Sequence, residues 1–297
     1  MMGEIFQSAT GFSVQPLEKT FGAIIRDIGL RDLDEVTFDD IYQTWLTYGL
    51  LIFPGQKLDK CEQIAFARRF GELVEELKAI EISNVKPDGT LRDAPNDDMM
   101  KIARGNMYWH QDSTFMPVQA KGAVLSAHVV PQHQGDTAFS DMRDAYDALD
   151  DAMREKISSL AAYHSLKYSQ RAVGEETKKD NSEYFGYGMN VADVPLRPLV
   201  KTHPETGRKA LAVGRHAYGI PGLSEMESEE LIKQLNSFAV ADERRVYHHR
   251  WAVGDVVVWD NRCLMHRACE WDFSEARVML HSRIAGDPAS EQGIVGN

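Results

Sequence analysis

The chain is poor in cysteine and has no excess of positive charge. Only three cysteines occur in 297 residues, and no two of them form a CxxC pair. An odd number without that spacing favours reduced thiols, as in a cytoplasmic protein, over a disulfide framework. The formal net charge is −12, with 33 Lys and Arg against 45 Asp and Glu. Because no basic cluster is present to neutralise phosphates, we expect neither a nucleic-acid nor a membrane partner.

Long apolar runs and leader-like segments are also missing. No run approaches the roughly 20 residues of a membrane-spanning helix. The first residues, Met1 to Phe6, lack a basic stretch followed by an apolar core, so no signal peptide is visible. We find no low-complexity linker and no internal repeat, and the 43% hydrophobic content can fill one large core. We therefore expect residues 1–297 to form a single domain in the cytoplasm.

The most informative feature that is present is the tripeptide His110-Gln111-Asp112. Side chains two residues apart on an extended segment point the same way, so the histidine and the carboxylate can bind one face of a metal ion. A second histidine from elsewhere would complete the facial triad of non-haem Fe(II) oxygenases, which leaves three coordination positions open. An HxD tripeptide alone is weak evidence, and its value depends on the residues downstream.

The candidate second histidine is His266. The run Val256 to Trp259 is β-branched and aromatic and follows a Gly-Asp turn signal, which predicts a buried strand. The residues 260–262 end that strand, and His266 lies just beyond on a short extended segment. The sequence therefore predicts His110, Asp112 and His266 as ligands of Fe(II).

An iron of this kind needs electrons from a co-substrate, and 2-oxoglutarate can supply them while it chelates the metal. Its far carboxylate requires a fixed cation. Arg277 lies eleven positions after His266, at the start of an apolar strand, and its planar guanidinium can pair with both carboxylate oxygens. Thr137, in Gly135-Asp136-Thr137, offers a hydroxyl partner. The plainer interpretations are a surface arginine for Arg277 and a turn hydroxyl for Thr137.

At this point the chain resembles the Fe(II)/2-oxoglutarate-dependent dioxygenases of the taurine dioxygenase and 2,4-dichlorophenoxyacetate dioxygenase family. The resemblance covers nearly the whole chain, and its motifs are specific in combination. Further likeness is to the (S)-2-aryloxypropionate (dichlorprop-type) dioxygenases. The segments that carry it are 64–71, 109–113, 135–137, 207–209 and 259–262 for the family, and 97–102, 116–123 and 281–288 for the narrower group.

The resemblance implies a fold, cofactors and a reaction. The fold is mostly β with flanking helices around a double-stranded β-helix (jelly-roll) core. The cofactors are Fe(II), 2-oxoglutarate as co-substrate, and O2. An aryloxyalkanoate would be oxidised at its ether-bearing carbon, which yields a phenol, pyruvate or glyoxylate, succinate and CO2. It also suggests a homo-oligomer. The alternative substrate is taurine, an alkylsulfonate or another small acid.

One departure from the family concerns the substrate anion. Where taurine dioxygenases carry an arginine four residues after the co-substrate arginine, this chain has His281, and Arg283 follows on the same strand face by parity. This weakens the case for taurine and favours a carboxylate on a bulkier molecule, bound by Arg283 and His281. Asn106 matches a substrate-contacting position of the taurine enzymes, and a plain loop asparagine is an equal alternative.

Several other patterns compete for the same roles. His203-Pro204-Glu205 is also an HxE tripeptide, but Pro204 and the following Thr206-Gly207 favour an exposed turn between strands. His248 and His249 are adjacent and should point to opposite faces. His216 could approach the site from a strand end, although a packed or surface histidine is the simpler expectation. A Zn(II) hydrolase on the same three ligands and a catalytically inactive jelly-roll binding protein stay open as alternative functions.

Local signals predict several elements around the motifs. Helices are expected over 34–48 with Thr37 as its cap, over 59–70, in two segments within 141–164, and after a capping box at 224–227. Strands are expected over 50–53, 124–130, 211–214, 246–249, 255–259 and 277–284. The polar stretch 86–106 is expected to be a mobile loop that closes over substrate.

Overall fold

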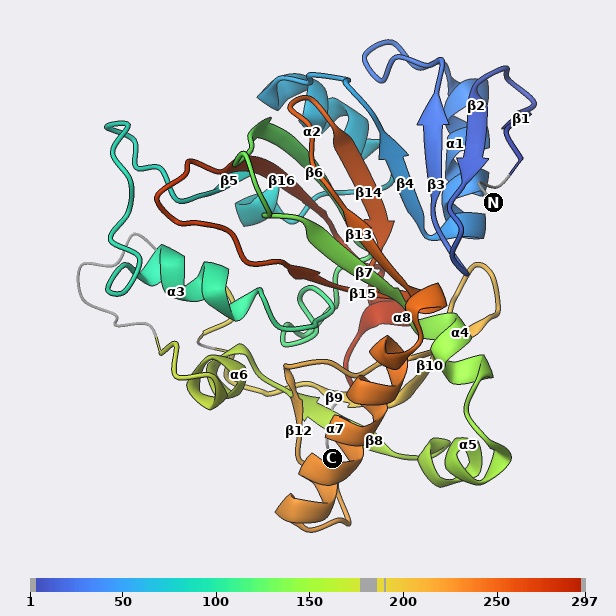
Figure 1. The fold of residues 1–297 in the computed structure, drawn as a ribbon. Coiled ribbons are helices and arrows are strands. Elements are labelled where there is room, and N and C mark those ends of the chain that lie inside the picture. The colour runs from blue at the N-terminus through green and yellow to red at the C-terminus, as the bar shows by residue number, and fades with distance from the viewer. Residues whose placement is uncertain (1–3, 177–185, 190, 295–297) are drawn as a thin grey trace.

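The computed structural model describes residues 4–176, 186–189 and 191–294. Its largest feature is an eight-stranded sheet with the order β1-β2-β3-β4-β14-β6-β16-β5 (Figure 1). The central strands are rich in Val, Ile, Leu and Ala and are buried on both faces, as expected for a sheet that is covered on both sides. The strands are β1 Phe6–Gln7, β2 Ser13–Pro16, β3 Ala23–Arg26, β4 Leu50–Phe53, β5 Ile80–Ser83, β6 Gly122–Val129, β14 Val256–Asp260 and β16 Val278–Ile284.

A second antiparallel sheet packs against the first. It has the order β13-β7-β15, from β7 Thr137–Asp141, β13 Val246–His249 and β15 Leu264–Ala268. Its apolar side chains, including Phe139 and Met265, share one buried cluster with Leu125 and Val257 of the large sheet. Two sheets, antiparallel apart from the parallel pair β3–β4, enclose a common core with helices outside them and form the predicted jelly-roll arrangement.

Two helices cover the outer face of the large sheet. The helix α1 Glu35–Tyr48 and the helix α2 Lys60–Arg68 bury Trp45 and Phe66 in a cluster with β4 and β14. The prediction that Thr37 caps α1 is wrong. Asp34 is the cap, because its carboxylate accepts from the Thr37 amide in the first turn. Gly49 ends α1 with φ 74°, a left-handed conformation that favours glycine.

The segment predicted as a mobile loop contains a helix. Asp97 caps α3 Asp98–Gly105, whose first turn is held by hydrogen bonds from the amides of Met99 and Met100 to that carboxylate. The capping residue sits in a run rich in Asp, Asn and Pro, which the sequence analysis took as loop only. Arg104, in the last turn, pairs with Glu175 through two hydrogen bonds of 2.6 and 2.7 Å and so attaches α3 to the chain after α6 Leu166–Ala172.

Most of the remaining elements lie together below the two sheets in the view of Figure 1. Two predicted helical segments appear as α4 Met142–Asp147 and α5 Asp151–Ile157, but the end of that predicted region forms the strand β8 Ala161–His164. The capping box at Ser224 and Glu227 is confirmed at the start of α7 Glu225–Ala241. The other elements are β9 Leu196–Pro198, β10 Val200–Thr202, β11 Lys209–Leu211, β12 Ala217–Tyr218, α8 Pro288–Glu291, and the 3-10 helices Glu75–Leu77 and Glu243–Arg245.

Among the described residues, none of the helices combines the length and the apolar character that crossing a membrane requires.

Candidate metal centre and its cavity

The three predicted metal ligands lie together between the two sheets. One possible ligand atom from each of His110, Asp112 and His266 lies within 4.8 Å of the others. The Nε2 atoms of both histidines are 3.8 Å from the Asp112 carboxylate, each facing a different oxygen. All three side chains are buried, at 4%, 6% and 7% exposure in that order. The arrangement is therefore a compact and largely dry donor set.

Backbone pairing brings the two histidines together. The amide of His110 donates to the carbonyl of His266 at 3.0 Å, and the amide of His266 donates back at 2.8 Å. His266 lies in β15, whereas His110 makes only this isolated bridge. Asp112 begins a turn in which Ser113 has φ 55°. The expectation of a fully extended HxD segment thus holds for His110 and is wrong for Asp112.

The protonation of these groups suits a cation. The Nδ1 atom of His110 lies 2.8 Å from the Tyr108 carbonyl, so the Nδ1–H tautomer leaves the Nε2 lone pair toward Asp112. Burial lowers the pKa of His110 to about 4 and that of His266 well below its usual value. Burial alone would raise the pKa of Asp112, but Arg283 and His266 hold it well below the usual range.

The donor set also contains buried polar atoms that form no hydrogen bond with the described residues. Asp112 Oδ2 and His266 Nδ1 are buried and have no hydrogen-bond partner among the residues that the structure describes. A buried carboxylate oxygen without a donor is costly unless a cation approaches it. Two neutral imidazoles and one carboxylate are a ligand set that divalent iron prefers. The residues present therefore fit a divalent metal ion.

The two residues predicted to bind a substrate anion face the same carboxylate. Arg283 donates from Nη2 to Asp112 Oδ1 at 2.7 Å and from Nη1 to the Ser113 hydroxyl at 3.0 Å. His281 Nε2 lies 3.7 Å from Asp112 Oδ2. Both come from β16, on the face predicted by parity. The pairing of β16 with β6 shifts register between Val278 and Met279, where His128 of β6 has no partner in β16. The extra residue lies in β6, so the side chains along β16 still alternate between its two faces.

Thr137 and Arg277 lie at one end of the cavity, on the side of the second sheet. They line a pocket with His266, Trp259 and Trp271. Trp251 donates to the Thr137 hydroxyl oxygen at 3.0 Å, which leaves the hydroxyl proton for another acceptor. The guanidinium of Arg277 is 4% exposed and lies 5.2 Å from the centre of the Trp271 ring. Among the described residues, no carboxylate forms an ion pair with Arg277. Burial of the guanidinium lowers the pKa of Arg277 to about 10.

The other end of the cavity is apolar. Asn106, predicted as a substrate contact, borders both ends together with His110, Asp112, His281 and Arg283. The apolar lining comes from the 3-10 turn and β5, from α3, from the turn after Asp112, and from α6: Leu77, Ile80, Ile82, Met99, Ile102, Ala103, Phe115 and Leu166. The pocket residues 99, 102 and 103 of α3 and its C-cap residue 106 recur at helical spacing, so one face of the helix closes the pocket.

Several residues of the cavity were missed by the sequence analysis. Tyr187 also lines the apolar pocket, and its hydroxyl lies 2.9 Å from that of Ser113. His216 is packed, as expected, at 2% exposure and edge-on to Phe115, and it also borders this pocket, which the sequence had left as the less favoured possibility. A helical period at 99, 102, 103 and 106 could have indicated α3, whereas no local pattern marks Tyr187.

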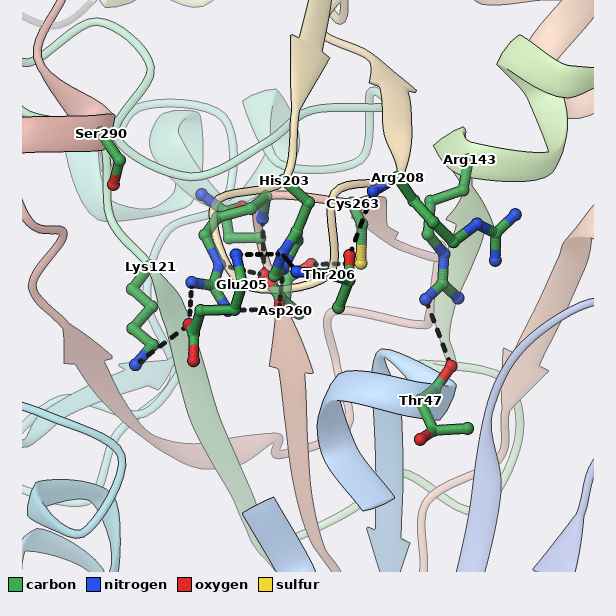
Figure 2. A network of polar contacts seen from close by, with 12 residues as sticks. Thr47, Lys121, Arg143, His203, Glu205, Thr206, Arg208, Asp260, Cys263 and Ser290 are labelled. Carbon is green, nitrogen blue, oxygen red and sulfur yellow. Dashed lines mark hydrogen bonds and ion pairs between the residues drawn. The ribbon is translucent and has the colours of Figure 1, made fainter. Parts of the chain in front are cut away.

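The competing HxE tripeptide does not form a metal site. His203 follows β10 in a hairpin turn, as predicted, but it is buried at 2% exposure and not exposed. Its Nε2 atom lies 2.9 Å from Asp260 Oδ2 (Figure 2). An ion pair partner in the core explains the burial. His248 is exposed and His249 buried, in agreement with their predicted opposite orientations.

Comparisons with known proteins agree with this geometry. The sequence model described as "Taurine catabolism dioxygenase TauD, TfdA family" matches residues 13–283. An (S)-phenoxypropionate/alpha-ketoglutarate-dioxygenase of Sphingobium herbicidovorans is 57% identical over 95% of this chain and 98% of its own length. An alpha-ketoglutarate-dependent 2,4-dichlorophenoxyacetate dioxygenase of Cupriavidus pinatubonensis is 36% identical over 92% and 97%.

Solved structures show the same fold. The crystal structure of AAD-2 in complex with Mn(II) and N-oxalylglycine has a TM-score of 0.86 and 33% identity, over 95% of this chain and all of that one. The fold, the donor set and the sequence likeness therefore lead to the same conclusion. The chain belongs to the TauD/TfdA family of dioxygenases.

Proposed function

We propose that the protein is an Fe(II)- and 2-oxoglutarate-dependent dioxygenase that oxidises an aryloxyalkanoate, an (S)-2-phenoxypropionate in particular, at the ether-bearing carbon. One observation carries the proposal. The donor set His110, Asp112 and His266 lies between a polar pocket with the buried Arg277 and an apolar pocket, and a second arginine, Arg283, borders both. A dicarboxylate co-substrate and an aryl acid need this combination. The relatives named for phenoxypropionate add independent support.

The assignment of ligands and anchors follows the chemistry of each side chain. His110, Asp112 and His266 hold Fe(II), with Asp112 neutralising part of its charge. Arg277 pairs with the far carboxylate of 2-oxoglutarate, and the Thr137 hydroxyl donates to that carboxylate while it accepts from Trp251. A buried guanidinium without an anionic partner is a prepared binding site for such a group.

The substrate is oriented from the opposite side. Arg283 and His281 face the metal ligands and hold the substrate carboxylate, and Asn106 contacts it from the C-terminal end of α3. The aryl ring enters the pocket of Ile82, Ile102 and Phe115, where burial of its apolar surface contributes binding energy. This places the carbon between carboxylate and ether oxygen toward the metal ligands.

The balanced reaction needs no acid–base pair from the protein. Bound Fe(II) supplies the oxidising chemistry, in which O2 and 2-oxoglutarate give succinate, CO2 and one oxygen atom inserted into a substrate C–H bond. The hydroxylated carbon then carries both a hydroxyl and an aryloxy group, and it releases the phenol with formation of a 2-oxo acid. A propionate gives pyruvate, and an acetate gives glyoxylate. The residues of the chain orient both acids and exclude water.

The taurine or alkylsulfonate alternative is less well supported. Sulfonates with short chains do not need an apolar pocket built from several separate elements. A Zn(II) hydrolase would leave the buried Arg277 and the Thr137–Trp251 contact without a purpose. Two expectations from the sequence, a cytoplasmic location and a homo-oligomer, stay proposals.

The experiment that tests the function is a substrate panel. The purified protein with Fe(II), 2-oxoglutarate and O2 is offered both enantiomers of a 2-phenoxypropionate, a phenoxyacetate, taurine and an alkylsulfonate, and succinate and phenol are measured together. We expect equal amounts of succinate and phenol with the (S)-phenoxypropionate. If both enantiomers are inert while a sulfonate is consumed, the proposed substrate class is wrong.

A further inference from the structure

Asn261 occupies the turn that joins the strand β14 to the strand β15, which carries His266. The turn covers residues 261–263, and the Asn261 side chain is completely buried. It has no place in the metal donor set, and nothing in the reaction proposed above uses an amide there. A buried amide is costly unless all its hydrogen bonds are satisfied, so its partners explain its presence.

Those partners are the backbone groups of Asp112. The Asp112 amide donates to Asn261 Oδ1 at 2.7 Å, and Asn261 Nδ2 donates to the Asp112 carbonyl at 2.8 Å. The same Nδ2 donates to the Ala120 carbonyl at 2.9 Å. One side chain thus holds both the N–H and the C=O of the carboxylate residue, which fixes the backbone on both sides of its Cα atom. Asp112 needs this support because it starts a turn and lies outside the strand pairing that holds His110.

The turn around Asn261 is itself held rigidly. Asp260 accepts from Arg262 Nε at 2.8 Å and from Arg262 Nη2 at 2.7 Å, and His203 lies 2.9 Å from the same carboxylate. Figure 2 shows Asp260 at the centre of this network, with Glu205 and Lys121 at its edge. Arg262 Nη1 also pairs with Glu205 at 2.5 Å. Buried charges on either side of Asn261 therefore anchor the residue that contacts Asp112.

We propose that Asn261 is a positioning residue that sets the Asp112 carboxylate against His110 and His266 for metal binding. The inference rests on the proposed metal site and adds a residue that acts on it through backbone contacts alone. It also gives a role to the His203–Asp260–Arg262 network, which lies directly behind the turn. Residues that orient metal ligands commonly change metal affinity by roughly 10–100-fold when they are replaced.

The test measures Mn(II) affinity of the protein without co-substrate, by the electron paramagnetic resonance signal of free Mn(II). Asn261→Ala should weaken Mn(II) binding by roughly 10–100-fold. The matched control is Gln56→Ala. The Gln56 amide also holds backbone groups at both of its ends, accepting from the Leu30 amide at 3.1 Å and donating to the Ile28 carbonyl at 3.0 Å, and none of these residues lines the cavity. Mn(II) affinity of this control should stay within about twofold of the wild type.

A second readout keeps the test decisive if Asn261→Ala is unstable. Asn261→Ser retains a polar group but cannot bridge both backbone groups of Asp112, and it should show the same loss. Hydrogen exchange of the peptide around Asp112 should be faster in either variant, while exchange of β4 and β14 stays slow.

Three results would overturn the inference. The first is that both Asn261 variants fold and bind Mn(II) like the wild type. The second is that Gln56→Ala weakens binding equally, because the effect would then be general loosening. Either of these two results would leave the assignment of the metal centre unchanged. The third is that the wild type itself fails to bind Mn(II), which would remove the metal centre and the positioning role together.

Discussion

Arg277 is the residue whose surroundings bear most directly on co-substrate binding. Its guanidinium is buried, stacks on Trp271 and meets no carboxylate among the described residues. We expect Arg277→Ala to raise the apparent KM for 2-oxoglutarate by roughly two to three orders of magnitude, since a charge-assisted pair is lost at ~2–5 kcal/mol. Steady-state succinate formation measures this.

The matched variant is Arg277→Lys, which keeps the charge but loses the planar fork and should be intermediate. Mn(II) affinity without 2-oxoglutarate should change little in either variant. A wild-type KM for 2-oxoglutarate in Arg277→Ala would refute the assignment of this residue.

Arg283 has a contact that the sequence did not indicate, an ion pair with the proposed metal ligand Asp112. We expect Arg283→Ala to lower kcat/KM for the aryloxypropionate and to uncouple the reaction, so that succinate forms faster than phenol. The reason is that a poorly placed carbon misses the reactive position. The ratio of phenol to succinate, measured in one assay, is the readout, with Mn(II) affinity followed in parallel because of the Asp112 contact.

An unchanged ratio together with an unchanged substrate KM would place the carboxylate site elsewhere. His281 is then the next candidate, because it lies on the same face of β16 and borders both pockets.

At the scale of elements, α3 defines the apolar end of the cavity. Ile102 lies on the face of α3 that lines this pocket. We expect Ile102→Ala to lower kcat/KM for a phenoxypropionate by roughly 10-fold or more, which is the order of ~1–3 kcal/mol for a lost apolar contact in a substrate pocket. The KM for 2-oxoglutarate should be unaffected, because Arg277 and Thr137 lie at the other end.

The control for this variant is Val36→Ala, a similar truncation at a site on α1 that is 69% exposed. If Ile102→Ala acts no more strongly than Val36→Ala, α3 does not contact the aryl group.

The elements also show what the sequence could and could not predict. The strands β4 and β13 were predicted with their observed bounds, because short apolar or alternating runs between turn signals determine them locally. The helix α3 was missed because the run rich in Asp, Asn and Pro before it was taken as loop, although Met99, Ile102 and Ala103 recur at helical spacing. His203 was predicted to be exposed because its partner Asp260 is 57 residues away in the chain.

The same distinction applies to the candidate site. His110, Asp112, His266, Thr137 and Arg277 could be identified from spacing and chemistry, and the structure brings them to one cavity. The ion pair of Arg283 with Asp112 and the hold of Asn261 on the same residue depend on tertiary contacts between distant segments. No local pattern encodes such contacts.

At the scale of the whole molecule, buried neutral histidines make stability depend on pH. His164 is buried, and its ring nitrogens have no hydrogen-bond partner among the described residues. Burial lowers its pKa to about 3. Because the unfolded chain binds a proton near pH 6.5 and the folded chain does not, stability is lost as pH falls below that value. The loss from this one residue should reach about 2 kcal/mol at pH 5.

The measurement is the free energy of urea unfolding of the metal-free protein at pH 8 and pH 5, in the wild type and in His164→Gln. The wild type should lose about 2 kcal/mol more than the variant between the two pH values. Equal losses in the two proteins would mean that His164 is not held neutral by the fold.

The proposal that residues 1–297 form one dioxygenase domain implies a single cooperative unfolding transition in the same urea experiments.

The central claim is that His110, Asp112 and His266 hold the iron to which 2-oxoglutarate binds. The most direct measurement is the visible charge-transfer absorption that appears when Fe(II) and 2-oxoglutarate are added to the protein without oxygen. We expect a weak band in the wild type and no band in His110→Ala or Asp112→Ala. A band of wild-type intensity in His110→Ala or Asp112→Ala would contradict the assignment.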